Sequence, residues 1–271
     1  MIKQNIGFIG SGNMGLAIIK GLIASKIAKP EQITVFDIVK EKLKQQSNEL
    51  KFNVGSSEIE VAKQADILFL AVKPNIINNV LKTIKDSLSK GTILVSIAAG
   101  VTLEAMEYVL GKDCKIVRVM PNTPALVNMG MSSLTQNENV STTEMETIST
   151  IFNSLGESEI VPESLIHAVT GVSGSSPAYV FLFIEAMADA AVLAGMPRAQ
   201  AYKFAAQAVM GSAKMVLETG KHPGELKDMV CSPSGTTIEA VKKLEATGFR
   251  SSVIEAINSC VEKSKLMSNT K

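Results

Sequence analysis

The sequence predicts a doubly wound α/β domain followed by an all-helical domain. Two observations predict this fold class: short β-rich runs alternate with helical patterns as far as Val161, and strand patterns stop after Pro162. Such alternation is typical of a parallel sheet that is covered by helices and connected by right-handed crossovers. We therefore expect one domain over residues 1–161 and a second over residues 162–271.

Each strand of the first domain is expected where a short run of apolar and β-branched residues ends at a loop. Two of these runs, residues 65–72 and 92–99, are apolar on both faces, as strands buried between two helical layers should be. The expected strands are residues 5–10, 33–37, 65–72, 92–99, 115–120 and 158–161.

Helical patterns occupy segments between these runs. One covers residues 13–25, and a Lys/Glu-rich pattern continues to Leu50. Ser141, with Glu144 three residues later, has the spacing of a capping box and should begin another helix. We expect Gly156 to end that helix.

Two long apolar helices dominate the second domain. They are expected over residues 177–194 and 198–219, with Ser176 as the cap of the first and Gly195 and Gly220 as the stops. Both are apolar or Ala-rich around most of their circumference, so they must be buried on several sides. A single small domain offers too little cover, and we therefore expect a homodimer whose helical domains wrap around each other.

Composition and charge exclude several classes of partner. The chain has 271 residues, of which 46% are apolar and 20% charged, and its net charge is +1. Because Lys and Arg are spread along the chain, we expect no nucleic-acid or anionic-membrane partner. Three scattered cysteines and two isolated histidines indicate neither a disulfide framework nor a metal site. A cytoplasmic location is the corresponding expectation.

The apolar stretch Ala178–Gly195 is the strongest candidate for a membrane span. It carries Glu185 and Asp189, so we interpret it as a buried helix of a globular domain. The N-terminus has no basic-then-apolar leader, and secretion is therefore not expected.

The glycine pattern "GFIGSGNMG" begins in the first expected strand and leads into a helix. Gly10 permits a tight turn, Gly12 lets the backbone approach a pyrophosphate, and Gly15 allows the helix to pack on the strand. The helix N-terminus then offers N–H groups and a partial positive charge to the phosphates. The first domain is therefore predicted to be Rossmann-like and to bind a dinucleotide. The expected cofactor-binding residues of this loop are Gly10, Ser11, Gly12, Asn13, Met14 and Gly15.

Asp37, at the end of the second expected strand, is the predicted partner of the ribose hydroxyls. A carboxylate there favours the 2′-hydroxyl of NADH and repels the 2′-phosphate of NADPH. Lys40 and Lys42 follow closely and could soften that repulsion. We expect NADPH or NADH as the cofactor and favour NADH.

The loops after the next two strands should flank the same crevice, at the carboxyl ends of the strands. The cofactor-binding residues expected there are Ala71, Val72, Lys73, Pro74, Ala98 and Ala99. Lys73 is either a catalytic lysine or a loop lysine that lies near the phosphates or in solvent. We prefer the second interpretation.

A dinucleotide domain implies hydride transfer, yet the chain offers little acid–base equipment. Of its three arginines, Arg118 falls in an expected buried strand, and Arg198 and Arg250 fall on helices. Two polar turns, residues 173–177 and 232–237, each lead into an expected helix. Each turn either binds a substrate carboxylate through backbone N–H groups or only caps its helix.

Three stretches resemble the Δ1-pyrroline-5-carboxylate reductase family. They are "ADILFLAVKP", "RVMPNTPALVNMGMSSL" and the run over residues 170–245, which contains "HPGELKDMVCSPSGTTI". The likeness covers essentially the whole chain in the right order. It implies an enzyme of proline biosynthesis that reduces pyrroline-5-carboxylate to L-proline with NADPH or NADH. It also implies a homodimer, which in some relatives assembles further into rings.

The resemblance also implies roles for particular residues. The loop that matches "SGTT" is implied to bind the substrate carboxylate through backbone amides and to belong to the partner subunit's active site. Thr237 is implied to hydrogen-bond the ring nitrogen and is the expected catalytic residue. Pro121 and Asn122 are implied to lie near the nicotinamide, and Glu163 matches a position close to bound product in some relatives. The implied substrate-binding residues are Ser232, Gly235, Thr236, Thr237 and Glu163.

Two positions depart from the family pattern. The family usually reads SGSGP and SPGGTT, whereas this chain has Ser175 and Ser234 at the corresponding glycines. If either position requires a positive φ, its serine carries a strain of about 1 kcal/mol or more.

Two other functions compete with this interpretation. A β-hydroxyacid dehydrogenase or related imine reductase shares the glycine loop, but its catalytic lysine would lie on the first helix of the second domain. Residues 178–195 contain no lysine. The other alternative is a protein that binds the dinucleotide without turning anything over.

Overall fold

The computed structural model describes residues 2–269, so the predicted domain ends Met1 and Lys271 lie outside the described residues. The chain divides into two compact units. Unit 1 contains the residues up to Gly174 together with those from Val261 onward, and unit 2 is Ser175–Cys260. The predicted boundary after residue 161, between a dinucleotide-binding domain and a helical domain, stays a prediction.

Unit 1 is built around one eight-stranded sheet in the order β3-β2-β1-β4-β5-β6-β7-β8. All neighbouring strands are parallel except β6 and β7, which are antiparallel. The strands are β1 (Ile6–Ile9), β2 (Ile33–Phe36), β3 (Asn53–Val54), β4 (Ile67–Leu70), β5 (Ile93–Ser96), β6 (Lys115–Met120), β7 (Gly130–Gln136) and β8 (Gly156–Ile160). The predicted doubly wound α/β class is confirmed.

Two strands were not expected from the sequence. β3 has only two residues, which is too short for a pattern. β7 buries Ser132, Ser133 and Thr135, so its buried positions do not read as apolar. Thr135 satisfies its hydroxyl by donating to the carbonyl oxygen of Val161 at 2.8 Å.

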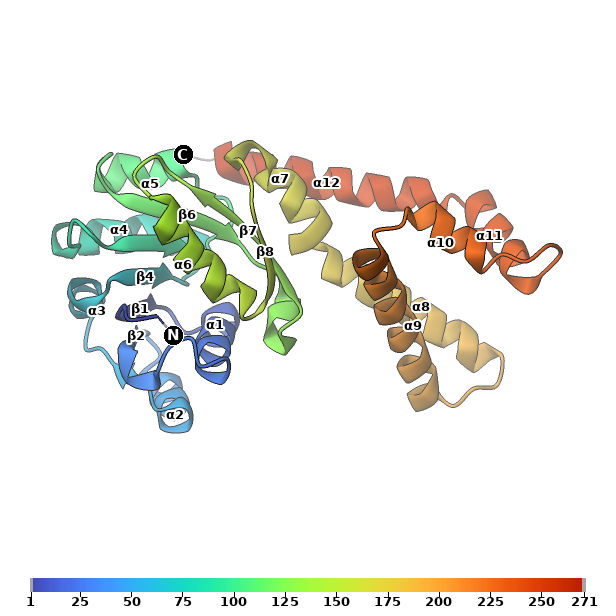
Figure 1. Cartoon of the computed structure of the whole chain (residues 1–271), viewed down its shortest axis with the longest axis horizontal. Helices are drawn as coiled ribbons and strands as arrows, with labels where there is room; N and C mark the ends of the chain where they lie inside the picture. The colour runs from blue at the N-terminus through green and yellow to red at the C-terminus, as the bar shows by residue number, and fades with distance from the viewer. Residues whose placement is uncertain (1, 270–271) are drawn as a thin grey trace. The chain divides into compact units, whose positions relative to one another are not determined.

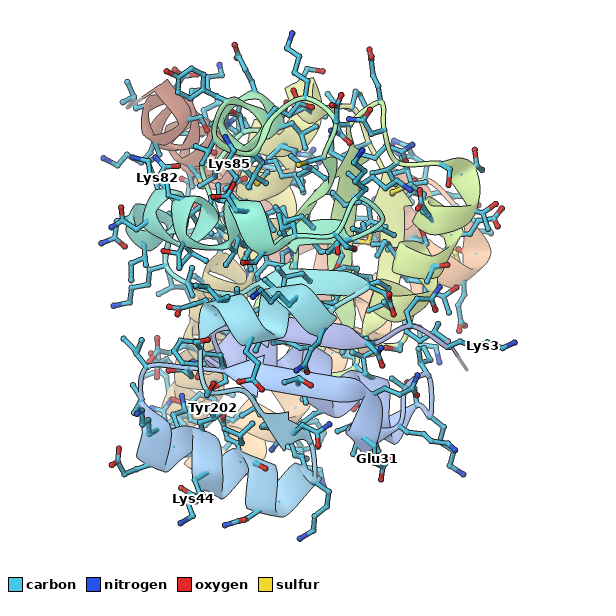
Figure 2. The ribbon with its side chains drawn as sticks, turned by 90° about the vertical axis from the view of Figure 1, so that its left-hand side faces the viewer. Lys3, Glu31, Lys44, Lys82, Lys85 and Tyr202 are labelled. Carbon is cyan, nitrogen blue, oxygen red and sulfur yellow. The ribbon has the colours of Figure 1, made fainter. Side chains whose placement is uncertain are left out.

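Helices cover both faces of the sheet. Figure 1 shows α3, α4 and α5 on one side and α1 and α6 on the other. These helices are α1 (Asn13–Ala24), α2 (Lys40–Leu50), α3 (Glu58–Gln64), α4 (Ile77–Ile84), α5 (Leu103–Leu110) and α6 (Thr142–Asn153). Figure 2 shows Lys44 of α2, Lys82 of α4 and Lys85, which directly follows α4, at the surface of unit 1.

The apolar core consists of two clusters, one on each face of the sheet. Alternate residues of one strand belong to different clusters: Phe69 lies in the cluster with α1 and α6, and Leu70 in the cluster with α3, α4 and α5. Phe69 stacks on Phe8 with ring centroids 4.6 Å apart and lies 6.1 Å from Phe152 of α6. Full burial of each such ring contributes about 1.5–3 kcal/mol to folding.

The predicted capping box at the start of α6 is confirmed. The Ser141 backbone N–H donates to Glu144 Oε2 at 2.9 Å, and the Glu144 backbone N–H donates to Ser141 Oγ at 3.4 Å. The predicted helix end is wrong by a few residues, because α6 stops at Asn153 with Ser154 as its C-cap. Gly156 instead begins β8 with φ 140°, where a Cβ would lie 2.0 Å from the carbonyl oxygen of Gly130.

Unit 1 ends in helical segments. They are η5 (Glu163–Leu165), α7 (Ile166–Val169) and the π-helical turn η6 (Thr170–Gly174), to which the last residues of α12 (Phe249–Asn269) are added from Val261 onward. His167 Nδ1 and Ser264 Oγ lie 2.9 Å apart and join α7 to this end of α12.

Unit 2 is entirely helical in its regular structure. It contains α8 (Ser176–Leu193), α9 (Arg198–Thr219), α10 (Pro223–Met229), α11 (Thr236–Ala246) and the first part of α12. The predicted stops are confirmed, since Gly195 and Gly220 follow α8 and α9 with φ of 95° and 63°. The predicted start is one residue late, because Ser176 is already helical and Ser175 is the N-cap.

The two long helices are largely exposed in the single chain, which agrees with the expectation that one small domain offers them too little cover; their burial by a second subunit stays a prediction. Only Ala188 is buried on α8, and only Ala201 and Ala205 on α9. Leu182 is 66% exposed and Phe204 also 66%. By length and composition, the helical run Glu163–Leu193 would be able to cross a membrane.

Candidate active site

The carboxyl ends of five parallel strands lie in register along one edge of the sheet. Ile9 of β1 pairs with Phe36 of β2 and Leu70 of β4, Leu70 with Ser96 of β5, and Ser96 with Arg118 of β6. The strand order reverses between β1 and β4, which is where ligands bind in such sheets. Every cofactor-binding residue predicted from the sequence lies in the loops that follow these strands or in the first turn of the helix that comes next.

The three glycines of the first loop meet different demands. Gly10 has φ 99°, and a Cβ there would lie 2.5 Å from the carbonyl oxygen of Ala71. A Cβ on Gly15 would lie 2.9 Å from the carbonyl oxygen of Gly10. At Gly12 a Cβ would meet nothing within 4 Å, so the backbone faces open space. That open side fits the close approach of a pyrophosphate.

The start of α1 presents hydrogen-bond donors that no side chain caps. Its N-cap is Gly12, which has no side chain to cap the helix, and the first turn contains no acidic residue. The backbone N–H groups of Asn13, Met14 and Gly15 therefore lack intrahelical acceptors. Together with the helix dipole they form an anion site of the kind that holds dinucleotide phosphates.

Asp37 is held by the glycine loop itself. Its Oδ2 accepts from the backbone N–H of Ser11 at 2.6 Å and from Ser11 Oγ at 3.1 Å. Its Oδ1 accepts from the backbone N–H of Val39 at 2.9 Å. The carboxylate is thereby fixed beside the loop, with lone pairs left for ribose hydroxyls. The sequence pattern did not predict these bonds to Ser11.

The loop after β4 packs against the glycine loop, while its tip is solvated. The backbone N–H of Ala71 donates to the carbonyl oxygen of Ile9 at 2.9 Å. Lys73 and Pro74 are exposed, and Lys73 forms no ion pair within the described part of the chain. This placement favours the interpretation of Lys73 as a loop lysine, and its role stays a prediction. Ala98, after β5, is buried.

The side chain of Asn122 is fully used within unit 1. Its Oδ1 accepts from the backbone N–H of Met131 at 2.9 Å. Its Nδ2 lies 3.3 Å from the carbonyl oxygen and 3.2 Å from Oγ of Ser173. Asn122 thus fixes η6 beside the end of β6, where Pro121 is buried. Contact of either residue with the nicotinamide stays a prediction.

Glu163 is the counter-ion of a buried arginine. Arg118 Nη1 donates to Glu163 Oε1 at 2.8 Å, and the arginine side chain is only 4% exposed. The same Oε1 accepts from the backbone N–H of Leu103, at the start of α5, at 2.8 Å. An arginine inside an apolar strand is a signal that an acidic partner must exist, but the sequence does not say which one. The substrate-binding role of Glu163 stays a prediction.

The polar turn at residues 173–177 joins a π-helical turn to the start of α8. Ser173 and Gly174 lie inside η6, and α8 follows directly. Whether this turn binds an anion or only caps α8 stays a prediction. Ser175 has φ −99°, so replacing the family's glycine causes no backbone strain there.

The second polar turn, in unit 2, has the predicted form. The backbone N–H of Gly235 donates to the carbonyl oxygen of Ser232 at 3.1 Å, which closes a four-residue turn. Pro233 occupies its second position and Ser234 its third, with φ 56°. Since proline cannot adopt a positive φ, the turn is type II, which favours glycine at the third position. Ser234 thus carries the strain considered from the sequence.

The start of α11 is uncapped. Its N-cap is Gly235, and no side chain accepts from the first turn. The N–H groups of Thr236, Thr237 and Ile238 therefore lack intrahelical acceptors. Thr237 is half-buried, and its hydroxyl bonds to no residue that the structure describes. This turn and helix start can hold a small carboxylate next to a free hydroxyl.

All three arginines have acidic partners. Besides Arg118, Arg198 Nη1 lies 2.5 Å from Asp189 Oδ1, and Arg250 Nε lies 2.7 Å from Glu245 Oε1. His222 is also engaged, as Nδ1 caps α10 by accepting from the backbone N–H of Gly224 at 3.0 Å.

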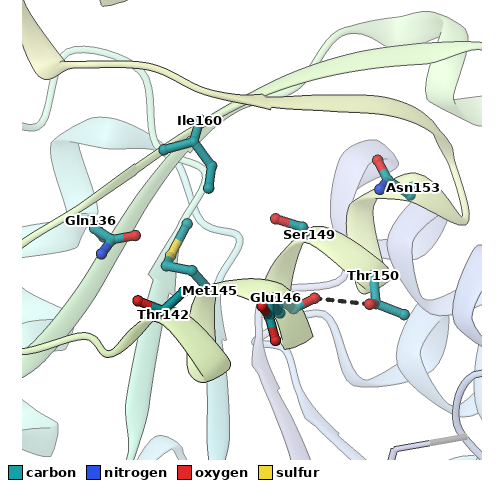
Figure 3. A pocket seen from close by; sticks show the side chains of 8 residues that line it. All are labelled: Gln136, Thr142, Met145, Glu146, Ser149, Thr150, Asn153 and Ile160. Carbon is teal, nitrogen blue, oxygen red and sulfur yellow. Dashed lines mark hydrogen bonds between the residues drawn. The ribbon is translucent and has the colours of Figure 1, made fainter.

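A cavity of about 480 Å³ lies elsewhere on unit 1, on the outer side of α6. Figure 3 shows that its lining side chains come from α6, with Gln136 of β7 and Ile160 of β8. Hydroxyl and amide groups predominate, and Glu146 is the one ionisable lining residue. The cavity adjoins the last two strands of the sheet rather than the strand ends that carry the glycine loop.

The sheet topology and the glycine loop define a dinucleotide-binding oxidoreductase fold. A family model described as NADP oxidoreductase, coenzyme F420-dependent, matches residues 5–100, and one described as pyrroline-5-carboxylate reductase dimerisation matches residues 163–267. The pyrroline-5-carboxylate reductase of Escherichia coli (strain K12) is 60% identical over 99% of this chain and the whole of that protein. The chain belongs to the pyrroline-5-carboxylate reductase family.

Solved structures give the same result. A pyrroline-5-carboxylate reductase from Coxiella burnetii superposes with a TM-score of 0.92 at 37% identity, covering 99% of this chain and 100% of that one. The Plasmodium falciparum pyrroline carboxylate reductase, solved with NADP bound, has a TM-score of 0.90 at 36% identity with the same coverage. The hydroxyacid dehydrogenase and non-catalytic alternatives are not favoured.

Proposed function

We propose that this chain reduces 1-pyrroline-5-carboxylate to L-proline, the last step of proline biosynthesis. Family membership at 60% identity over the full length supports the reaction. The structural observation that carries the proposal is the strained turn at the uncapped start of α11, in a chain whose three arginines are all paired. A small anionic substrate finds its carboxylate partners there.

The proposed reaction needs little acid–base chemistry from the protein. The substrate is a cyclic imine, and in its protonated form the imine carbon already accepts a hydride readily. NADH or NADPH supplies that hydride. The chain's task is to hold the ring in place, and positioning alone accounts for a large share of such rate enhancements.

Each part of the α11 turn has a proposed role. The backbone N–H groups from Gly235 to Thr237 bind the substrate carboxylate, and Ser232 shapes the turn. The Thr237 hydroxyl accepts from the protonated ring nitrogen and fixes the orientation of the ring. This role needs no general base, because the free hydroxyl of Thr237 has only to accept a hydrogen bond. Glu163 is a proposed neighbour of the product.

The proposed cofactor residues are those of the loops after β1, β2, β4, β5 and β6. Asp37, fixed by Ser11 and Val39, favours NADH because a 2′-phosphate would meet its carboxylate. We expect Asp37→Ser to raise kcat/KM with NADPH and lower it with NADH, measured by initial rates. A wild-type enzyme with a much higher kcat/KM for NADPH would refute this preference.

A homodimer is the proposed functional unit, and higher rings of dimers are compatible with it. The apolar surfaces of α8 and α9, exposed in the single chain, support a second subunit as their cover. Glu185 and Asp189 within α8 argue against lipid as the cover. We place the enzyme in the cytoplasm, with no nucleic-acid or membrane partner.

Subunit mixing tests whether the α11 turn completes the partner's site. Thr237→Ala removes the hydroxyl from one subunit, and Gly12→Glu fills the open side of the glycine loop in the other. Refolding the two inactive variants together should restore activity if the turn acts across the interface. Mixed dimers without activity would place the turn in its own subunit's site.

The reaction itself is tested by the absorbance of the reduced nicotinamide. Purified protein with NADH or NADPH should consume it only when pyrroline-5-carboxylate is added, and proline should appear in equal amount. No turnover with either cofactor would overturn the proposed function.

A further inference from the structure

Gln46 is a buried amide on a helix whose other polar side chains are mostly exposed. It lies on α2, is 6% exposed, and shares the buried face of that helix with Leu43. Its Nε2 donates to the carbonyl oxygen of Ser11, 35 positions away in the sequence, at 3.1 Å. It belongs to none of the sequence motifs, yet it reaches the glycine loop.

This bond fixes the direction of the next N–H group. The peptide between Ser11 and Gly12 is trans, as are all peptides in the described chain. In a planar trans peptide the C=O and N–H bonds point in opposite directions. With the Ser11 carbonyl held towards Gln46, the N–H of Gly12 points away from α2. It has no acceptor among the described residues, and the backbone of Gly12 borders open space.

The preceding peptide is held in the same manner by Asp37. Its Oδ2 accepts the N–H of Ser11 at 2.6 Å, so the carbonyl of Gly10 points the other way. Ser11 itself is completely buried. Two successive peptide groups of the loop are therefore oriented by side chains from outside the loop, one acidic and one amide.

A cost in stability accompanies the amide. Gln46 Oε1 is buried and has no hydrogen-bond partner among the described residues. An unsatisfied buried acceptor destabilises the folded protein, whereas an apolar side chain beside Leu43 would not. A residue kept for packing alone would be apolar, so the contact with Ser11 is the feature that distinguishes glutamine here.

We propose that Gln46 is a positioning residue for the cofactor: it aims the N–H of Gly12 at the pyrophosphate of the bound dinucleotide. Gln46 acts through the loop and touches no reacting atom. The inference rests on the proposed use of NADH or NADPH, and it adds a residue that neither the glycine pattern nor the ribose-binding acid indicates.

Direct binding measurements test the proposal. The reduced nicotinamide can be excited at its own absorbance band, where protein side chains do not absorb, so its fluorescence reports binding directly. Gln46→Leu should raise the Kd of both NADH and NADPH about three- to tenfold, the range expected for one misdirected hydrogen bond. The loss should appear in Kd and in KM for the cofactor rather than in kcat, and the Tm of the unliganded protein should not fall.

Gln45→Leu is the matched control, because Gln45 is the neighbouring glutamine on the same helix and is exposed. It should leave both Kd values unchanged. Gln46→Glu should weaken binding more than Gln46→Leu, since a carboxylate oxygen would face the Ser11 carbonyl. Gln46→Met replaces Gln46→Leu if the leucine variant does not fold.

Three outcomes would overturn the inference. They are an unchanged cofactor Kd in the folded Gln46→Leu or Gln46→Met variant, an equal loss in Gln45→Leu, and a Kd loss that merely follows a lowered Tm. Failure of the wild-type protein to bind either cofactor would instead overturn the proposed function. The two failures are therefore distinguishable.

Discussion

Replacing Ser234 by glycine should either raise the Tm of the protein or lower its KM for pyrroline-5-carboxylate. Ser234 has φ 56° at the third position of the type II turn before α11. A left-handed conformation costs a residue with a Cβ about 1–2 kcal/mol. Glycine removes that strain, but its greater freedom in the unfolded chain lowers the free energy of unfolding by roughly 0.5–1 kcal/mol. The net gain is about 0.5–1 kcal/mol.

Two measurements detect a gain of this size. If the turn is formed in the free enzyme, the Tm of Ser234→Gly should rise by about 2 °C. If substrate binding completes the turn, the gain should appear as a KM for pyrroline-5-carboxylate that is about two- to fivefold lower. Steady-state rates at saturating cofactor and a thermal melt without ligand separate these cases.

Ser175→Gly is the matched control, because Ser175 is the other serine at a position where the family usually has glycine. Its φ of −99° is unstrained, and its Oγ accepts from Cys260 Sγ at 3.2 Å. Glycine there should lower the Tm or leave it unchanged. An unimproved Tm and KM in Ser234→Gly, or an equal improvement in Ser175→Gly, would refute the strain argument.

The remaining predictions concern the site and its supports. Thr237→Ala should lower kcat severely while the cofactor Kd stays unchanged; equal activity would remove Thr237 from the site. Glu163→Ala should destabilise unit 1 by about 3 kcal/mol in urea unfolding, because it leaves Arg118 buried without a counter-charge; the double variant with Arg118→Met should recover much of this. Burial, with the Arg118 and Lys265 cations, lowers the pKa of His167. The unfolded chain therefore takes up this proton first as pH falls below about 6.5, and Tm should fall with it, less so in His167→Gln.

The fold was largely predictable because its signals are local. Buried parallel strands are continuously apolar, and the glycine loop has a fixed spacing. β7 escaped prediction because its buried residues include hydroxyls, and that of Thr135 bonds to Val161, 26 positions away in the sequence. The partner that covers α8 could not be predicted for a related reason, since periodicity reports that a face must be covered but not by which chain.

The site was predictable to the extent that backbone geometry determines it. Glycines at positions 10, 12 and 15 and the turn before Thr237 follow from short patterns. The side chains that hold these loops do not, because Gln46 and Asn122 act through contacts with residues 35 and 51 positions away. The role of a polar residue outside any motif can be inferred only from its contacts in the folded protein.

Both proposed anion sites depend on the same choice of N-cap residue. α5 and α6 begin with Thr102 and Ser141, whose side chains accept an N–H of the first turn and so consume a donor. α1 and α11 begin with Gly12 and Gly235, which keep the helix start but leave its donors free. Glycine at an N-cap costs only a few tenths of a kcal/mol relative to serine. The two proposed anion sites would thus cost the chain little stability, and neither would need an arginine.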